Sequence, residues 1–208
     1  MTPIKSRMIA AVLAFVALAG ASAARCQTGQ ETRGLPNFGR VTGILYRGGQ
    51  PDSAGFTALQ TMGVGIVVNF RDDPRETATE KRQVESLGMQ YVGIPWSAHD
   101  EPSNAQVVQF LDLVRANPKV KIFVHCRRGA DRTGVMIAAY RIAVEHKPVA
   151  GAVSEMHQFH YDWFWLPHLE GYVKSLPGLL QKDARFSAYA LAPSHAAAAA
   201  TSARSAEF

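Results

Sequence analysis

Cysteine is scarce in this chain of 208 residues, which contains only Cys26 and Cys126. A disulfide between them would join a leader segment to a loop in the middle of the chain, and no other feature of the sequence calls for such a bond. We therefore interpret Cys126 as an unpaired thiol. The sequence leaves open whether the two cysteines pair and how Cys126 stays reduced outside the cytoplasm.

The chain also lacks a long run of charge of one sign. Its 22 basic and 17 acidic residues give a formal net charge of +5 and a pI of about 9.4. This balance mildly favours anionic partners, but the positive charge is not gathered in one tract, so nucleic acid is not a predicted partner. The length is sufficient for one domain with a hydrophobic core, and we expect a monomer.

The apolar run at residues 8–20 is too short for a transmembrane helix. Two basic residues precede it and the small residues 21–23 follow it, a pattern typical of a secretory signal peptide. We therefore predict a signal peptide over residues 1–23 and an exported protein, periplasmic or secreted. After cleavage no stable membrane insertion is expected.

The remaining chain divides into three parts by composition. Residues 24–40 are polar and glycine-rich, and we predict a flexible arm there. Residues 41–185 carry the periodic apolar patterns of a folded domain. From residue 186 the chain becomes rich in alanine and serine, so residues 186–208 are predicted to be a disordered tail.

Short apolar strands alternate with helical patterns within residues 41–185. Strands are expected at 44–46, 65–70, 89–95 and 119–126, and helices at 52–63, 76–88, 103–117, 132–146 and 148–159. This alternation predicts a single α/β domain with a central, mostly parallel sheet flanked by helices. The aromatic-rich segment 159–173 is expected to pack on that sheet.

The segment HCRRGADRTG, residues 125–134, lies between the last predicted strand and the helix after it. Backbone amides of such a loop, together with the helix N-terminus, form a cradle for an anion. Gly129 allows a tight curl of the backbone, and the guanidinium of Arg132 can bind two oxygens of a phosphate. The same positive field stabilises a thiolate at Cys126, which makes it a nucleophile.

Cys-x5-Arg followed by Ser or Thr is the signature of the cysteine-dependent protein tyrosine phosphatases, and HCRRGADRTG matches HCxxGxxR[ST]G at every fixed position. The chain resembles that superfamily, and its atypical dual-specificity branch of bacteria, plants and fungi most closely. The segments LYRGGQP, LQTMGVGIVVNFRDD, LGMQYVGIPWS and VKIFVHC resemble successive landmarks of this branch. The resemblance implies a dual-specificity phosphatase-like fold, with the P-loop between the last core strand and a helix.

The resemblance also implies a phosphomonoester hydrolase that forms a phosphocysteine intermediate and needs no metal or cofactor. Cys126 would be the nucleophile, Arg132 would stabilise the transition state, and His125 would support the thiolate through hydrogen bonds. Thr133 would assist hydrolysis of the intermediate. Phosphate-binding residues are expected along the whole loop: Arg127, Arg128, Gly129, Ala130, Asp131, Arg132 and Thr133.

The family also uses a general acid, usually an aspartate on a loop before the P-loop strand. The segment IPWSAHDEPS occupies that place, and Asp100 is our first choice. Glu101 is the second choice and Asp72 the third. The position that matches the acid in some relatives is Ala98, so the identity of the acid stays open.

Several alternatives remain at this point. Arg127 and Arg128 resemble a basic pair in plant and fungal members that act on inositol pyrophosphates, so phosphoinositides and inositol (pyro)phosphates rival phosphorylated proteins as substrates. The pair can also be plain solvated loop residues. A phosphate-binding pseudophosphatase would lack an effective acid, whereas intact Cys126 and Arg132 favour an enzyme. Arsenate reductases of the small phosphatase type need extra cysteines, of which this chain has only Cys26.

Two further sets of residues have more than one interpretation. Arg47 and Arg71 lie near predicted strand ends, where they either face the site or pair with nearby acids. His157, His160 and His168 do not complete the spacing of a metal site with cysteines or carboxylates. We therefore predict no metal site.

Overall fold

The computed structural model describes residues 33–190. The predicted signal peptide, the first part of the predicted arm including Cys26, and residues 191–208 of the predicted tail lie outside the described residues. Within the described part, no helix is both long enough and apolar enough to cross a membrane.

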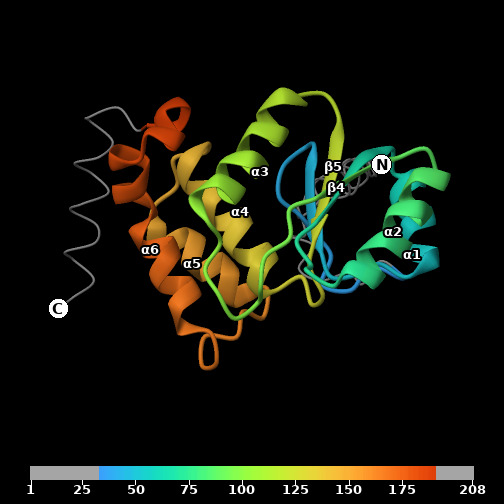
Figure 1. The fold of residues 1–208 in the computed structure, drawn as a ribbon, viewed down its shortest axis with the longest axis horizontal. Helices are drawn as coiled ribbons and strands as arrows, with labels where there is room; N and C mark the ends of the chain where they lie inside the picture. Colours follow the sequence, from blue (N-terminus) through green and yellow to red (C-terminus); the bar gives the residue numbers. More distant parts are fainter. Residues whose placement is uncertain (1–32, 191–208) are drawn as a thin grey trace, which may run out of the picture.

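A five-stranded sheet forms the centre of the molecule (Figure 1). Its strands are β1 (Gly39–Arg40), β2 (Leu45–Gly48), β3 (Val64–Asn69), β4 (Gln90–Gly93) and β5 (Lys121–His125). The spatial order is β1-β2-β5-β3-β4, and every pair is parallel except the antiparallel pair of β1 and β2. The predicted α/β fold with a mostly parallel sheet is confirmed, and β5 lies in the middle of the sheet.

Helices cover both faces of the sheet. Figure 1 shows α1 (Ser53–Thr61) and α2 (Pro74–Ser86) on one side of it. The helices on the other side are α3 (Asn104–Ala116), α4 (Asp131–Ala143), α5 (Val149–Gln158) and α6 (Pro167–Lys182). A short 3-10 helix, η1 (Ala184–Tyr189), follows α6. The result is a three-layer arrangement in which the strand ends are left open for loops.

Local sequence signals set the starts of three helices. Asp52 caps α1 by accepting a hydrogen bond of 2.8 Å from the Gly55 amide. Asp73 caps α2, where Pro74 occupies the first turn, so α2 begins two residues before the predicted position. Ser103 and Gln106 form a reciprocal capping box at α3. These caps explain why the helix positions were readable from the sequence.

The sheet separates two hydrophobic cores. Along β5, Ile122 and Val124 face the core beneath α3–α6, while Phe123 faces the smaller core beneath α1 and α2. Helix α4 is buried along its whole length, because it lies between the sheet and helices α3, α5 and α6. The N-terminus of α4 is therefore held rigidly at the carboxyl end of β5.

The folded domain extends beyond both predicted boundaries. Leu35 lies within the predicted flexible arm, yet it is buried in the core beneath α1 and α2, and β1 also falls within that arm. At the other end, Phe186 and Tyr189 of the predicted tail are buried against the core beneath α3–α6. The division at residues 40/41 and 185/186 is corrected in this respect, because isolated apolar side chains in polar segments still pack.

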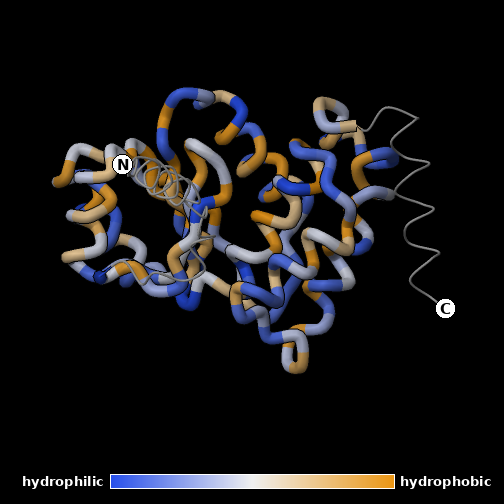
Figure 2. Tube along the Cα trace, turned by 180° about the vertical axis from the view of Figure 1, so that it is seen from behind, coloured by the Kyte–Doolittle hydropathy of each residue, from blue (hydrophilic) through white to orange (hydrophobic). Residues whose placement is uncertain are grey.

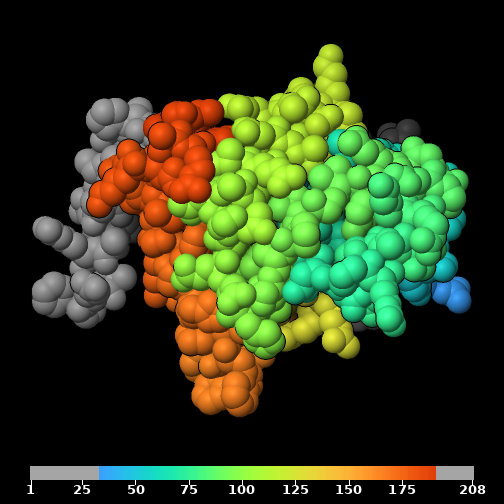
Figure 3. Space-filling view, viewed as in Figure 1, coloured from blue at the N-terminus to red at the C-terminus, as the bar shows by residue number. Residues whose placement is uncertain are grey.

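The aromatic segment 159–173 does not pack on the sheet as a whole, which corrects a prediction. Tyr161 is buried, but Trp163, Phe164 and Trp165 are 59%, 67% and 75% exposed in the loop between α5 and α6. This loop is the hairpin that projects from the molecule in Figures 2 and 3, where its atoms form the orange knob of Figure 3. Helices α4–α6 already cover the sheet, so the three rings stack edge-to-face on one another instead.

Burial predicts opposite outcomes for two aromatic residues. Phe110 is fully buried and packs edge-to-face on Phe70, so Phe110→Ala is expected to cost about 3–5 kcal/mol of unfolding free energy. Trp165→Ala at the exposed loop is the matched control and is expected to change it by about 0.5 kcal/mol or less. Urea unfolding of both variants measures the difference. Equal losses would contradict the exposed position of the loop.

Candidate active site

The P-loop, residues 126–130, connects the end of the central strand β5 to the first turn of α4. Cys126 is the first residue after β5, and it is 2% exposed. Helix α4 begins at Asp131, one residue before the predicted start at Arg132. The ends of β2 and β3 flank the P-loop, so their following residues form its surroundings.

The carbonyl groups of the P-loop are held on its outer side. The Gln50 amide donates to the Arg127 carbonyl at 3.0 Å, and the side-chain amide of Asn37 donates to the Arg128 carbonyl at 3.3 Å. Arg47 Nη2 donates to the Gly129 carbonyl at 2.9 Å. Because a peptide unit is planar and trans, the N–H groups of the same units point to the opposite side.

Those N–H groups form the anion cradle. Within residues 33–190, the amides at 127–130 donate to no protein acceptor. The N-terminus of α4 adds its positive dipole end directly after them. Convergent amides at a helix N-terminus bind anions, and phosphate in particular.

Gly129 is required at its position for two reasons. Its φ of +74° lies in the left-handed region, and an added Cβ would lie 2.3 Å from the Gly48 carbonyl carbon and 2.4 Å from the Gly49 nitrogen. The P-loop therefore sits directly on the backbone that follows β2. A side chain at residue 129 would lift the loop off that support.

Arg132 lies in the first turn of α4 and is almost completely buried. Its Nη1 donates to the carbonyl oxygens of Phe70 and Trp96, at 3.3 Å and 2.9 Å, and to the Asp72 carboxylate at 2.8 Å. These acceptors lie after β3 and β4, so two neighbouring strand ends fix the guanidinium beside the P-loop. Its other nitrogens make no hydrogen bond within residues 33–190, so they can serve a bound oxyanion.

The Thr133 hydroxyl is buried in the same turn without a hydrogen-bond partner. A buried hydroxyl left unsatisfied costs about 1–3 kcal/mol, and such groups call for an explanation beyond stability. Thr133 follows Arg132 directly and lies at the helix end that faces the cradle. The Thr133 hydroxyl is thus a further hydrogen-bond donor at this site that has no acceptor among the described residues.

His125 is held by a buried hydrogen-bond network that lies under the P-loop. Its Nδ1 lies 3.1 Å from the Cys126 carbonyl oxygen, and its Nε2 lies 2.8 Å from Oε1 of Glu80. The other oxygen of Glu80 accepts from the side-chain amides of Asn69 and Gln50, both at 2.9 Å. The imidazole orientation is thus set by four residues of different elements.

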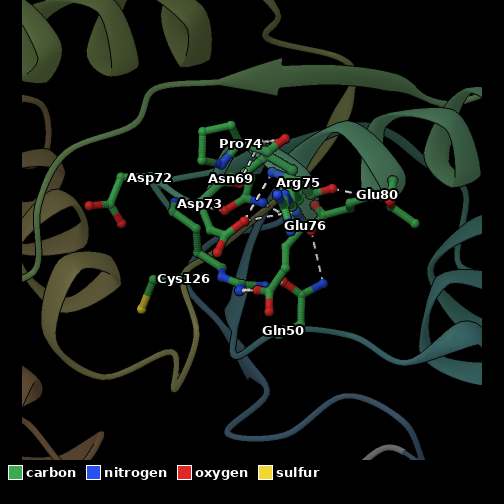
Figure 4. Close-up of polar contacts among 12 residues, drawn as sticks. Gln50, Asn69, Asp72, Asp73, Pro74, Arg75, Glu76, Glu80 and Cys126 are labelled. Carbon is green, nitrogen blue, oxygen red and sulfur yellow. Dashed lines mark hydrogen bonds and ion pairs between the residues drawn. The ribbon is translucent and has the colours of Figure 1, made fainter.

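Sequence analysis did not assign a role to Glu80. It lies on α2, which is mostly polar, yet it is buried on the same face as Val84. The only sequence signal for Glu80 was its position four residues before Val84, the buried valine of this otherwise polar helix. Figure 4 shows Glu80 and Gln50 within the polar cluster beside Cys126.

The three acid candidates are placed differently. Asp100 is exposed in the loop between β4 and α3, and within the described residues its carboxylate makes no ion pair or hydrogen bond. Glu101 is also exposed, and its charge contributes to raising the pKa of Tyr172, after burial as the main cause. Asp72 contacts Arg132, and in Figure 4 it lies on the same side of the cluster as Cys126.

The charged side chains of the P-loop and of Asp131, the first residue of α4, differ in their contacts. Arg127 is exposed, whereas Nη1 of Arg128 lies 3.7 Å from Asp131 and 3.6 Å from Asp162. The Asp131 carboxylate also accepts a hydrogen bond of 3.0 Å from the Asp162 amide. The side chains of Arg128 and Asp131, predicted to bind phosphate, thus tie the P-loop to the loop between α5 and α6.

Arg71 is engaged in side-chain pairs beside the site. Its guanidinium donates to Gln50 at 2.5 Å and forms an ion pair with Glu76. These three residues line a cavity of about 550 Å³ between α2 and the segment that precedes α1. Of the two interpretations, the structure therefore favours pairing with acids for Arg71.

No group of three or more potential metal-ligating side chains occurs within residues 33–190. Of the three histidines weighed for a metal site, His157 instead contacts Glu170 at 3.1 Å. The described residues therefore contain no candidate metal centre.

Comparison with known proteins identifies the family. A family model described as "DSP-PTPase phosphatase fused to NAD+ Kinase" matches residues 31–162, which is more than half of the chain. The chain belongs to this family. It is an atypical member of the dual-specificity branch of the cysteine phosphatases, as the P-loop signature predicted.

Individual relatives agree with this placement. The dual specificity protein phosphatase TpbA of Pseudomonas aeruginosa is 31% identical over 124 residues, which cover 59% of this chain and 54% of TpbA. The chain thus spans about half the length of this curated relative. A TpbA crystal structure has a TM-score of 0.60 and 26% identity, and the match covers 69% of this chain and 88% of that one.

A more distant solved structure shows the same fold. The catalytic core of Siw14 from S. cerevisiae has a TM-score of 0.58 at 18% identity, and the match covers 73% of this chain and 95% of that one. At this identity the likeness concerns the fold alone.

The contact of the P-loop with the backbone after β2 yields a prediction. Gly129→Ala forces a left-handed residue and a backbone clash, so we expect it to cost about 2–4 kcal/mol of unfolding free energy. Gly151→Ala is the matched control, since nothing lies within 4 Å of its added Cβ in α5, and it is expected to stabilise by about 0.5–1 kcal/mol. Urea unfolding measures both. A Gly129→Ala variant as stable as the parent would refute the close contact.

Proposed function

We propose that this protein is a phosphatase that hydrolyses phosphomonoesters through a phosphocysteine intermediate at Cys126. One observation carries the proposal. A buried thiol starts a loop whose carbonyls at residues 127–129 are bound from outside, while its amides and Arg132 have donors left for an oxyanion. Family membership and the name of TpbA support the same chemistry.

The geometry supports a two-step reaction. The phosphate oxygens bind the P-loop amides and Arg132, which places phosphorus next to the Cys126 sulfur. The thiolate attacks, an S–P bond forms, and the P–O bond to the leaving group breaks while a general acid donates a proton to the leaving oxygen. Water then attacks phosphorus, gives a proton to the same carboxylate, and the S–P bond breaks. In this proposal the buried Thr133 hydroxyl, which has no hydrogen-bond partner among the described residues, donates to the departing thiolate.

Asp100 is the proposed general acid. A general acid must reach the leaving oxygen with a proton to give, and a cation bound to its carboxylate would hinder this. Among the described residues the Asp100 carboxylate has no such partner. Its loop is anchored on both sides, by the bond from Arg132 to the Trp96 carbonyl and by the Ser103 cap of α3. Asp72 instead accepts a hydrogen bond of 2.8 Å from Nη1 of Arg132.

Phosphorylated proteins are the proposed substrates. A TpbA structure was solved in complex with phosphotyrosine, while Siw14 is described as a PP-IP phosphatase. A substrate with several phosphates needs further free cations at the loop, but the Arg128 guanidinium is already paired with Asp131 and Asp162. Only Arg127 of that basic pair is exposed without an acid partner among the described residues. This favours a singly phosphorylated site, with inositol (pyro)phosphates as the second candidate.

The signal-peptide pattern of residues 1–23 supports export, and we propose a periplasmic or secreted monomer. Fractionation of expressing cells tests the location, and the N-terminal sequence of the mature protein tests the cleavage after residue 23. Light scattering of the purified protein tests the monomer. An uncleaved N-terminus in the membrane fraction would overturn the export proposal.

Leaving-group dependence separates the nucleophile from the acid. Cys126→Ser is expected to abolish turnover of every substrate, because the S–P bond cannot form. Asp100→Asn is expected to lower kcat about 100-fold for a phosphotyrosine or phosphothreonine peptide, and much less for p-nitrophenyl phosphate, whose leaving oxygen needs no proton.

Asp72→Asn serves as the matched control for the acid. Asp72→Asn removes a carboxylate of the same site. Because Asp72 contacts Arg132, we expect this variant to change KM by a similar factor for the phosphopeptides and for p-nitrophenyl phosphate. If Asp72→Asn shows the dependence and Asp100→Asn does not, the assignment of the acid is reversed. If no substrate turns over while vanadate still binds, the protein is a phosphate-binding pseudophosphatase.

A further inference from the structure

Arg47 is a buried cation directly beneath the P-loop. It lies on β2, opposite Val124 of the neighbouring strand β5, and is 1% exposed. Arginine is rarely buried to this extent without a full set of partners. Its position one residue before the end of β2 places its side chain under the loop that begins at Cys126.

Few groups satisfy the Arg47 guanidinium. Its Nη2 donates to the Gly129 carbonyl at 2.9 Å, but Nε and Nη1 are buried without hydrogen-bond partners. The ring of Phe159 covers the guanidinium, with 3.8 Å between Cζ and the ring centroid. Gly39 lies opposite Arg47 on β1 and leaves room for this ring. A Cβ at residue 39 would lie 2.6 Å from the Phe159 ring.

The nearest acid, Glu155, forms only a long ion pair with Arg47. Glu155 lies 3.9 Å from Nη1, too far for a hydrogen bond, and both of its oxygens accept bonds from Arg141, at 2.7 Å and 3.1 Å. Glu145 supplies the second negative charge of this group, and it is bound by Arg141 and not by Arg47. Glu155 is therefore shared between two guanidinium groups, and the one hydrogen bond that Arg47 makes within the described residues goes to the P-loop.

The buried guanidinium nevertheless stays charged. Burial lowers the pKa of Arg47 from 12.5 to about 10, the charges of Glu155 and Cys126 oppose this shift, and Arg141 adds to it. Near neutral pH Arg47 is thus protonated. Burying an under-bonded charge costs several kcal/mol, so a role other than stability is the physical explanation that remains.

We propose that Arg47 is a positioning residue of this site, which holds the Gly129 carbonyl outward and supplies a fixed positive charge beneath Cys126 that favours the thiolate. The inference rests on the proposed function, because only a nucleophilic thiol needs a nearby positive charge that stabilises its thiolate form. It differs from the role of Arg132, which faces the bound oxyanion. Arg47 contacts neither substrate nor reacting atoms and acts through the loop and its charge.

Other charged groups face the same thiol and must be kept constant in a test. Arg132 approaches from α4, His125 with its partner Glu80 lies under the loop, and Asp72 lies at the rim. Arg47 has Glu155 of α5 and Arg141 of α4 on its other side. A variant of Arg47 or Glu155 changes none of these other charged groups.

Thiol ionisation tests the inference without any phosphatase assay. The rate of Cys126 alkylation by iodoacetamide is followed against pH, with the Cys126 peptide quantified by mass spectrometry so that Cys26 does not contribute. Arg47→Gln is expected to raise the midpoint by about one pH unit, because a nearby positive charge is lost. Arg47→Lys keeps the charge and is expected to restore most of the shift.

Glu155→Gln is the matched control with the opposite sign. It removes a negative charge beside Arg47, so we expect the Cys126 midpoint to fall, whereas damage to the fold would raise it in both variants. Circular dichroism establishes that each variant is folded. An unchanged midpoint in folded Arg47→Gln, or an unchanged or raised midpoint in Glu155→Gln, overturns the inference. If Arg47→Gln does not fold, the direction of the Glu155→Gln midpoint still decides it.

The same variants separate this inference from the proposed function. If phosphatase activity is present, Arg47→Gln is expected to lose kcat mainly at low pH and to recover as the pH rises through the new midpoint. Absent turnover with a shifted midpoint would refute the proposed function and keep the electrostatic role. Full turnover at all pH values with an unshifted midpoint would refute the role of Arg47 alone.

Discussion

The contact between the P-loop and the backbone after β2 is the constraint on which the site depends. Gly129 rests against Gly48 and Gly49, and this close approach brings the Gln50 amide and the Arg47 guanidinium within reach of two P-loop carbonyls. With those carbonyls bound outside, the amides have only the inner side left to them. The anion cradle is thus a consequence of how two parallel strand ends meet, and any substituent that separates them removes it.

Buried charge surrounds this contact on two sides. On the α2 side, Glu80 holds His125 against the Cys126 carbonyl, and on the α5 side, Glu155 lies behind Arg47. Charges in such positions are costly to bury, and they are kept where their hydrogen bonds orient a loop that must not relax. The thiol therefore lies in an environment shaped by groups that never contact a substrate.

Strong local signals explain which parts of the fold were readable in advance. The starts of α1 and α3 and the β-branched run of β3 depend on local signals, and the sequence placed all three within one or two residues. The ends of the domain and the exposed aromatic rings were misjudged, because burial of Leu35 or exposure of Trp165 depends on which surfaces are already covered. The composition of a segment does not report which surfaces other elements already cover.

The sequence by itself determined the chemistry of the loop: a thiol, a glycine and an arginine at fixed spacing between a strand and a helix, which suffice to place an anion cradle. Only the tertiary structure decided which other residues serve it. Glu80 and Arg47 lie 45 and 82 residues from their partners, His125 at the end of β5 and Gly129 in the P-loop. Contacts over such separations follow from strand order and packing, and a single sequence has no local periodicity that reports them.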